Sequence, residues 1–315
     1  MGITKEQIIE REEYLGGTDC AAILGLSKWR SPLQVFMSKV HPNRDDSEFK
    51  IGGKNEAAYW GTKLEDKVAE AFAEVTGKKV YRVNETLTHP EYPFIRANID
   101  RRVVGEDALL ECKTATVFKA KEWEGEEIPA EYILQVQHYL AVTGKDKGYI
   151  ACLIGGQKFI WKELHRDEQL IKQIVDAEIA FWNDFVLTKQ PPMVTGSDRD
   201  SDLLDRLYAD PEEKIVDLPE ELAQRMMVRT MNQTSIKALE EKNTLIENQI
   251  KAELKEATTG KVGDYLVTWK GQSRESVDSK KLKEANPVIW DLYKKTTEFR
   301  VLKISKVKEK VNGKH

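Results

Sequence analysis

Hydrophobic residues recur at helical spacing in several stretches of the first 190 residues and form short apolar runs in others. Between 57 and 76, apolar side chains return every three or four residues, which predicts an amphipathic helix ended by Gly77. The same pattern predicts further helices at 1–15, 20–24, 31–40, 129–143 and 167–186. Short β-branched runs predict strands at 80–83, 148–154 and 158–161. Strands backed by helices predict one α/β domain over residues 1–190.

The segment 94–113 has the pattern on which the functional interpretation depends. It reads F-I-R-A-N-I-D-R-R-V-V-G-E-D-A-L-L-E-C-K, two apolar runs around a glycine-containing break, and this predicts a β-hairpin. A two-residue loop at Gly105-Glu106 would pair the strands so that Asp100 lies directly opposite Glu111. Lys113 would then lie on the same face as Glu111, because side chains alternate along a strand.

Opposed carboxylates in this position require a positive partner. Directly opposite residues of an antiparallel pair have Cβ atoms about 4.5–5.5 Å apart, where like charges repel. A divalent cation fits between Asp100 and Glu111, with waters and the backbone carbonyl of Cys112 completing its shell. Lys113 would hold or deprotonate a water, or neutralise charge on a phosphoryl oxygen. A hairpin whose charged face is simply solvated fits the same residues, so both interpretations stay open from this pattern.

Two other polar positions also have two interpretations each. Glu65 adjoins the apolar stripe of the predicted helix 57–76, and its side chain points either toward the hairpin or into solvent. Gly16-Gly17-Thr18 precede the predicted helix 20–24. Paired glycines in that position let backbone N–H groups approach an anion, but an ordinary capped turn has the same sequence.

The last 125 residues follow a different pattern. Pro191-Pro192 and the Asp-rich stretch behind them predict a linker over 191–215. The remainder, 216–315, is predicted as a module with one long helix from Pro219 to about Gly260 and two strands, 265–269 and 299–304, around a helix containing Trp290. Apolar residues of the long helix keep close to heptad spacing: Ile236, Leu239, Ile246, Ile250 and Leu254. Such a stripe requires burial against a helical partner.

Composition narrows the class of protein. Apolar residues make up 40% and charged residues 32% of the chain, as in a soluble globular protein. The net charge of −4 gives no overall attraction for nucleic acid, so DNA binding would need a local basic surface. The three cysteines, Cys20, Cys112 and Cys152, are widely spaced in apolar surroundings and predict reduced thiols. With no apolar signal core or membrane-spanning run, a cytosolic protein is expected.

Four motifs follow one another between residue 11 and about residue 186. They are L-G-G-T-D-C-A-A-I-L-G-L-S-K-W-R-S-P, W-G-T-K-L-E, I-D with L-L-E-C-K, and Y-I-L-Q-V-Q-H-Y. In this order they resemble the YqaJ-type viral recombinase nucleases, relatives of phage lambda exonuclease. The resemblance implies a restriction-endonuclease-like fold, with a mixed central sheet flanked by helices.

The resemblance also implies a function. Family members use Mg²⁺ or Mn²⁺ to degrade linear double-stranded DNA from 5′ ends, leaving 3′ single strands for a single-strand annealing recombinase. The implied roles are metal binding by Asp100, Glu111 and the Cys112 carbonyl, support of a second metal or its water by Glu65, assistance to the attacking water by Lys113, its orientation by Gln135 and Tyr132, and 5′-phosphate binding by Arg11 and Thr18. A phage or prophage protein in a bacterial cytoplasm is expected, as a homo-oligomer for which the trimeric ring of lambda exonuclease is one form.

Two other functions fit the same core. A structure-specific DNA endonuclease would need no different residues, because the core sequence does not encode end selection. A non-catalytic adaptor for DNA ends or for the annealing protein would keep the fold, although the intact Asp, Glu and Lys set argues against it. The module 216–315 is expected either to dock a partner or to complete the nuclease as a lid.

Overall fold

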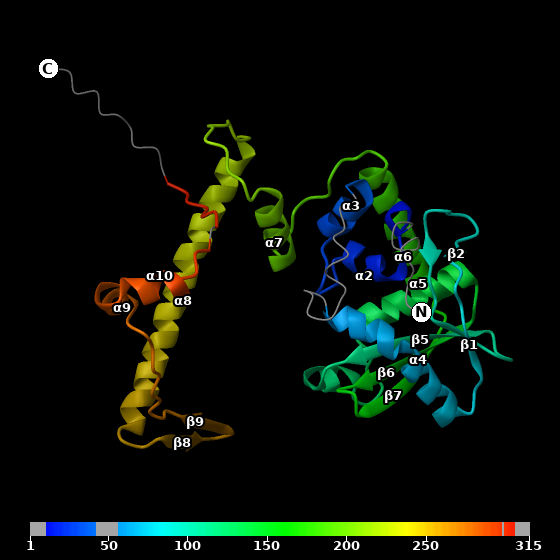
Figure 1. Ribbon diagram of the computed structural model, residues 1–315, viewed down its shortest axis with the longest axis horizontal. Coiled ribbons are helices and arrows are strands. Elements are labelled where there is room, and N and C mark those ends of the chain that lie inside the picture. The colour runs from blue at the N-terminus through cyan, green and yellow to red at the C-terminus, as the bar shows by residue number, and fades with distance from the viewer. Residues whose placement is uncertain (1–10, 42–55, 298, 306–315) are drawn as a thin grey trace. The chain divides into compact units, whose positions relative to one another are not determined.

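A five-stranded sheet lies at the centre of residues 1–207 in the computed structural model, which describes residues 11–41, 56–297 and 299–305 (Figure 1). Its strands are, in spatial order, β1 (Val80–Arg82), β4 (Arg101–Val103), β5 (Ala108–Ala115), β6 (Lys147–Ile154) and β7 (Lys158–His165). Strands β5 and β6 run parallel, and the other neighbours are antiparallel. The predicted mixed central sheet is therefore confirmed.

This part of the chain also contains helices and a second, smaller sheet. The helices are η1 (Arg11–Glu13), α2 (Gly17–Ile23), α3 (Pro32–Val40), α4 (Glu56–Thr76), η3 (Val117–Trp123), α5 (Ala130–Thr143), α6 (Glu168–Phe181), the π-helical η4 (Trp182–Val186) and α7 (Asp198–Leu207). A small sheet pairs β2 (Leu87–Thr88) with β3 (Arg96–Ala97). The predicted helices correspond to α2, α3, α4, α5 and α6 with η4. Of the helix predicted at 1–15, residues 1–10 lie outside the described residues.

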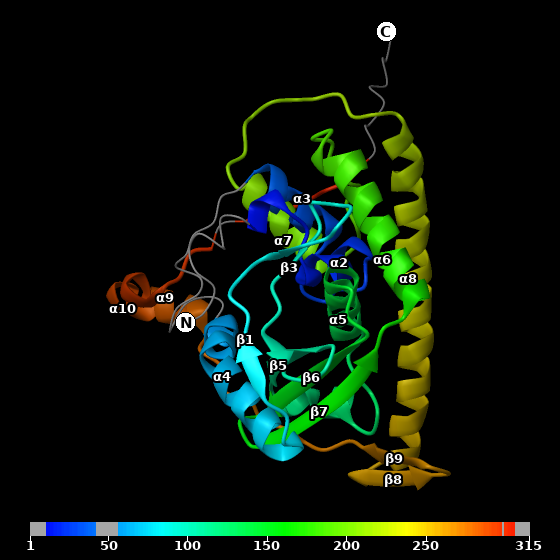
Figure 2. The same ribbon diagram turned by 90° about the vertical axis from the view of Figure 1, so that its right-hand side faces the viewer.

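Helices α4 and α5 cover opposite faces of the sheet (Figure 2). Phe72 of α4 packs in one core cluster with Leu110, and Val136 of α5 packs in another with Leu109. Leu109 and Leu110 are successive residues of β5, so their side chains point to opposite faces. Helix α5 approaches β6 closely at Gly148, where a Cβ would lie 2.6 Å from Cγ1 of Val136.

The central hairpin has the predicted register. Arg101 pairs with Leu110 and Arg102 with Leu109. The loop spans 104–107 and is longer than the predicted two residues. The N–H of Val104 in this loop donates to the carbonyl of Lys79, next to β1. Asp100 stands at the start of β4, opposite the part of β5 that holds Glu111.

The first unit continues beyond the proline pair. Leu203 of α7 joins the core cluster of α3, and the buried carboxylate of Asp200 accepts hydrogen bonds from Ser31 and from the N–H of Thr195. This part of the predicted linker is thus a packed helix.

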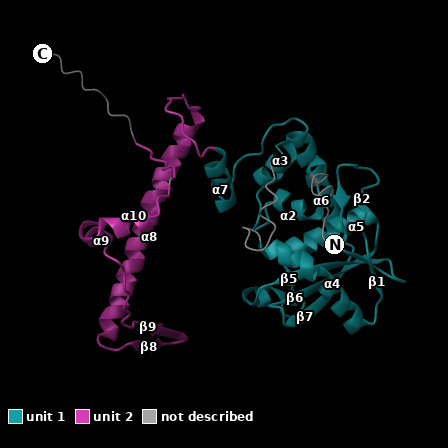
Figure 3. Ribbon diagram, viewed as in Figure 1, with its two compact units in different colours: residues 1–207 teal, residues 208–315 magenta. Residues whose placement is uncertain are grey.

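Residues 208–315 form the second unit (Figure 3). Its elements are α8 (Glu221–Leu254), β8 (Thr259–Val262), β9 (Tyr265–Thr268), α9 (Ser279–Ala285) and α10 (Pro287–Tyr293). The long predicted helix is confirmed as α8. The strand predicted at 299–304 is wrong: 299–305 contains no strand, and β9 pairs with β8 around Gly263. A tight turn between sequence neighbours has a smaller loop-closure entropy cost than a distant pairing.

Burial differs sharply between the units. No described residue from 208 to 305 is buried. No helix in the described part of the chain is both long and apolar enough to cross a lipid bilayer.

Candidate active site

Two carboxylates meet where β4 begins beside β5. The Oδ2 atom of Asp100 accepts a hydrogen bond of 2.7 Å from the N–H of Cys112, so the backbone of β5 fixes this carboxylate next to Glu111. Burial, together with the negative charges of Glu111 and Glu65, raises the pKa of Asp100 well above its ordinary value. The structure therefore brings together the acidic pair predicted from the hairpin register.

A hydrogen-bond network fixes the other predicted polar groups on the α5 side. The Nζ atom of Lys113 donates to Oε1 of Glu111 (2.7 Å) and to Oε1 of Gln135 (2.9 Å). The Nε2 atom of Gln135 donates to the same Glu111 oxygen (2.7 Å) and to the hydroxyl of Tyr139 (2.8 Å). Burial alone would lower the pKa of Lys113, but the carboxylates of Glu111 and Asp100 outweigh it and raise that pKa. Lys113 therefore remains a cation.

Tyr132 takes a different place from the one predicted. The Nζ atom of Lys113 lies 4.9 Å from the centroid of its ring, and that ring stacks on Trp123 with centroids 5.6 Å apart. Tyr139, one helical turn beyond Gln135 on α5, lines the pocket instead. Tyr132 thus packs against the ammonium group of Lys113, and Tyr139 is the tyrosine that lines the pocket. Its position on the same side of the predicted helix was the available sequence signal.

Glu65 reaches the site from α4. It lines the pocket with Asp100 and Glu111, and its Oε1 atom accepts from Nη1 of Arg101 at 2.6 Å. Arg82 approaches the same oxygen at 3.3 Å. Sequence reasoning missed Arg101. Strand alternation was a usable signal, since it places Arg101 on the apolar face that holds Val103, where a cation needs a partner.

Thr18 and the two glycines before it lie at the start of α2, packed against α5. The N–H of Gly16 donates to Oδ2 of Asp19 (3.1 Å), so that group is satisfied internally. Gly17 is needed for close packing, because a Cβ there would lie 2.6 Å from the ring of Tyr139. Thr18 is exposed and lines the acidic pocket. Arg11 begins η1, and its side chain lies outside the described residues.

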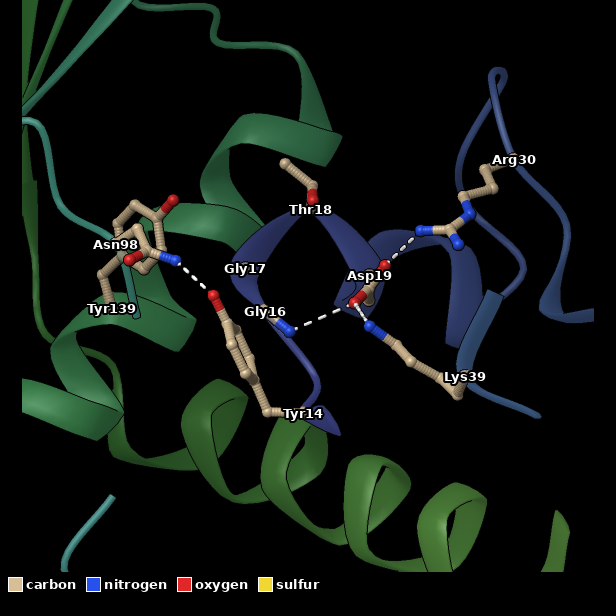
Figure 4. Close-up of a pocket in the computed structure, with 9 residues that line it drawn as sticks. All are labelled: Tyr14, Gly16, Gly17, Thr18, Asp19, Arg30, Lys39, Asn98 and Tyr139. Atoms are coloured by element: carbon tan, nitrogen blue, oxygen red, sulfur yellow. Dashed lines mark hydrogen bonds and ion pairs between the residues drawn. The ribbon is translucent and has the colours of Figure 1, made fainter. Parts of the chain in front are cut away.

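A second, smaller pocket adjoins the first (Figure 4). Thr18, Asn98 and Tyr139 line both. The second pocket also contains Asp19, whose buried carboxylate pairs with Arg30 and, at 3.0 Å, with Lys39. The Nδ2 atom of Asn98 donates to the hydroxyl of Tyr14 at 2.6 Å. Basic groups thus lie next to the acidic pocket, although the chain as a whole is acidic.

The carboxylate oxygens that line the first pocket, about 300 Å³ in volume, are suitable ligands for a hard divalent cation. Asp100 and Glu111 offer carboxylate oxygens, and Cys112 lines the pocket next to them. The Oε2 atom of Glu111 is buried, and no described residue donates a hydrogen bond to it. Among the described residues, no group of three or more His, Cys, Asp or Glu side chains is arranged to hold a metal ion. Oxygens of water or substrate would therefore complete the shell, as Mg²⁺ accepts.

Comparison with known proteins identifies close sequence relatives. The family profile of the YqaJ-like viral recombinase domain matches residues 9–146. The uncharacterized protein YqaJ of Bacillus subtilis (strain 168) is 44% identical over 306 residues, which cover 96% of this chain and 94% of that protein.

Solved structures are similar over about two thirds of the chain. An alkaline exonuclease (LHK-Exo) from Laribacter hongkongensis matches with a TM-score of 0.50 and 20% identity, over 65% of this chain and 98% of the other. A phage related exonuclease from Haemophilus somnus 129PT matches with a TM-score of 0.41 and 12% identity, over 62% and 96%. The first likeness agrees with the restriction-endonuclease-like arrangement of the mixed sheet.

Proposed function

Because the chain belongs to the YqaJ-like viral recombinase family, we propose that its acidic pocket hydrolyses linear double-stranded DNA from 5′ ends, leaving 3′ single strands. One observation carries the proposal: Asp100, Glu111, Lys113 and Gln135 line one pocket, with the last three joined by hydrogen bonds of 2.7–2.9 Å. Two carboxylates and a half-buried cation at one site are the groups that phosphoryl transfer requires.

Asp100, Glu111 and the carbonyl of Cys112 would hold Mg²⁺, for which Mn²⁺ substitutes, and Glu65 would support a second ion or its water. When bound, the metal supplies Lewis acidity and lowers the pKa of a water. The buried Oε2 of Glu111 supports this assignment, since a buried carboxylate oxygen needs a positive partner.

Lys113 would stabilise negative charge on a phosphoryl oxygen. Its raised pKa favours this role over proton abstraction, because a lysine that stays protonated cannot accept a proton. Glu111 and Gln135 accept hydrogen bonds from its ammonium group, and Gln135, with Tyr139 as its partner, would orient the attacking water. Tyr132 packs its ring against the same ammonium group.

The DNA end would enter beside Thr18. Thr18 and Asn98 line both pockets, so a 5′ phosphate bound there lies next to the acidic pair. We assign Thr18 and Arg11 to that phosphate and add the amide of Asn98. The 3′ strand would pass to a single-strand annealing recombinase in the bacterial cytoplasm, with the nuclease acting as a homo-oligomer.

A nuclease assay tests the proposal. Purified protein with Mg²⁺ is given linear duplexes with a 5′ phosphate or a 5′ hydroxyl, and a covalently closed circle as the control. We expect nucleotides released from 5′ ends, faster degradation of the phosphorylated duplex, and no cleavage of the circle. Cleavage of the circle would assign an endonuclease, and DNA binding without cleavage would assign an adaptor.

A further inference from the structure

Arg101, the first residue of β4, is buried beside the acidic pocket. Only 4% of its side chain is exposed. Its Nη1 atom donates to Oε1 of Glu65 (2.6 Å) and to the carbonyl of Asp100 (2.7 Å), and its Nη2 atom donates to Oδ1 of Asp66 (2.6 Å). One guanidinium therefore ties two consecutive residues of α4 to the residue that begins the hairpin. A planar fork of donors can do this, whereas a lysine ammonium makes point contacts only.

The contacts of Glu65 are one-sided. Every hydrogen bond and ion pair of Glu65 among the described residues uses Oε1, which accepts from Arg101 and lies 3.3 Å from Arg82. Glu65 also lines the pocket, and the two arginines leave its Oε2 atom available to the site. The arginines thus fix which oxygen of Glu65 is presented to the site.

The charges explain why such a clamp is needed. Asp100, Glu111 and Glu65 line the same pocket, and like charges this close repel. Without a cation at its back, the Glu65 side chain would turn toward solvent, because its own helix is exposed on both sides of it at Lys63 and Lys67. A positive charge at this place also weakens the attraction of the pocket for a metal ion. Arg101 therefore acts on metal affinity and on Glu65 geometry in opposite directions.

We propose that Arg101 is a positioning residue for the nuclease reaction. It holds the Oε1 atom of Glu65, so that only the Oε2 atom of Glu65 is available to the metal site. The inference rests on the proposed function. It requires that Arg101 affects turnover only through Glu65.

The test uses the full chain and two readouts, Mn²⁺ binding followed by electron paramagnetic resonance without DNA, and turnover on linear duplex. Arg101→Met removes a positive charge but also releases the Glu65 carboxylate, and because these two effects on Mn²⁺ affinity oppose each other, that affinity should stay within about tenfold of the wild-type value. Turnover should fall on the order of 100-fold, since Glu65 is no longer held in place. Parallel loss of Mn²⁺ affinity, turnover and melting temperature would make Arg101 a structural brace and overturn the inference.

Two further variants keep the test decisive. Arg101→Lys retains the positive charge but loses the planar guanidinium, so Mn²⁺ affinity should stay at the wild-type value while turnover falls. Unchanged turnover would contradict the role of the guanidinium in holding Glu65. Arg102→Met is the matched control, because Arg102 is the next residue of β4 and pairs with the exposed Glu85 at 3.4 Å. It should change neither readout, and a loss equal to that of Arg101→Met would overturn the inference.

A double-mutant cycle tests whether the effect passes through Glu65. Glu65→Gln alone should reduce turnover, and adding Arg101→Met should cause no further loss. Multiplied losses would show that Arg101 acts on something else. Failure of the proposed function would give a different result. If the wild-type chain binds no Mn²⁺, or if Asp100→Asn leaves Mn²⁺ binding unchanged, the pocket is not a metal site and Arg101 has no role in one.

Discussion

Helices α4 and α8 show the difference between the two units of the chain. Both have apolar residues at helical spacing in the sequence. Helix α4 buries Val68, Ala69 and Phe72 against the sheet. Helix α8 is longer and buries nothing: Ile236 is 55% and Leu239 59% exposed.

The comparison shows that a hydrophobic period specifies a need for burial but not the partner that meets it. Exposed pairs such as Lys237–Glu241 and Lys251–Glu247, at 4.0 and 3.7 Å, are the ion pairs that support α8. Each such pair is worth only about 0.3–0.5 kcal/mol. The apolar stripe on α8 is therefore suited to burial against another subunit or another protein. We propose that residues 208–315 dock a partner while residues 1–207 contain the chemistry.

The largest expected effect lies in the first unit. Asp100→Asn or Glu111→Gln should reduce Mg²⁺-dependent cleavage to background, because each removes a carboxylate from the metal site. Asp100→Asn should also raise the melting temperature slightly, since the raised pKa of Asp100 means that its ionised form destabilises the fold at neutral pH. A nuclease assay and thermal unfolding check both statements. Substantial cleavage by either purified variant would remove the metal assignment.

Buried charge should matter for stability in the first unit and hardly in the second. Burial alone would raise the pKa of Asp19, but Lys39 and Arg30 outweigh it and lower that pKa below its ordinary 3.8. The ionised Asp19 side chain therefore stabilises the fold above pH 3.8, and this contribution is lost as the pH falls below 3.8. Asp19→Asn should cost about 3–5 kcal/mol at pH 7, as breaking a buried pair does.

Denaturant unfolding over a pH series checks this prediction. The difference between wild type and Asp19→Asn should shrink at acid pH. Glu241→Gln in α8, which breaks an exposed pair, is the control and should change stability by less than about 0.5 kcal/mol. A difference that stays constant down to acid pH would show that Asp19 contributes through shape and not through charge.

Lys113 separates chemistry from metal binding within the first unit. Lys113→Met should lower turnover by about 10²–10³-fold, the usual cost of losing one transition-state contact. Mn²⁺ binding should persist, because Asp100 and Glu111 remain. Single-turnover kinetics with a parallel Mn²⁺ titration measure both quantities. Near-normal turnover would show that Lys113 is a surface residue of its strand and takes no part in the reaction.

The smallest effect on the nuclease is expected from α8. Leu239→Asp with Ile246→Asp should leave cleavage and the melting temperature unchanged, because neither side chain is buried within the chain. Association with the annealing protein or with further subunits should weaken on the order of 30-fold, about 2 kcal/mol for a hot-spot contact. Thr244→Asp, on the same helix outside the stripe, is the control. Loss of cleavage in the double variant would favour the lid.

Local sequence was sufficient for the part of the site that a hairpin determines. The register that places Asp100 beside Glu111 follows from strand alternation and a short loop, and a slip of one residue would have turned the apolar side chains outward. Groups that depend on distant contacts were not predictable in this way. Strand alternation places Arg101 on an apolar face, but its partners Glu65 and Asp66 come from α4, which is distant in the sequence. Helical spacing puts Tyr132 and Tyr139 on the same side of α5, and only the folded pocket shows that Tyr139 lines it.

Domain limits show the same dependence on distant contacts. The Asp-rich composition of 197–210 is typical of a linker, but Asp200 accepts a hydrogen bond from Ser31, and Leu203 packs in the core cluster of α3. Strand β8 was missed because Thr259–Val262 has few apolar residues, and the turn at Gly263 decides its pairing.

The most direct test of the division between the units is cleavage by a chain that ends at Leu207. This chain keeps Leu203 and Asp200 in the core, unlike one that ends near Pro191, and should fold on its own. We predict that it degrades linear duplex with Mg²⁺ at a rate near that of the full chain, that Asp100→Asn abolishes this activity, and that it no longer binds the annealing protein. A folded chain of residues 1–207 without activity, or one that still co-purifies with the annealing protein, would contradict the account.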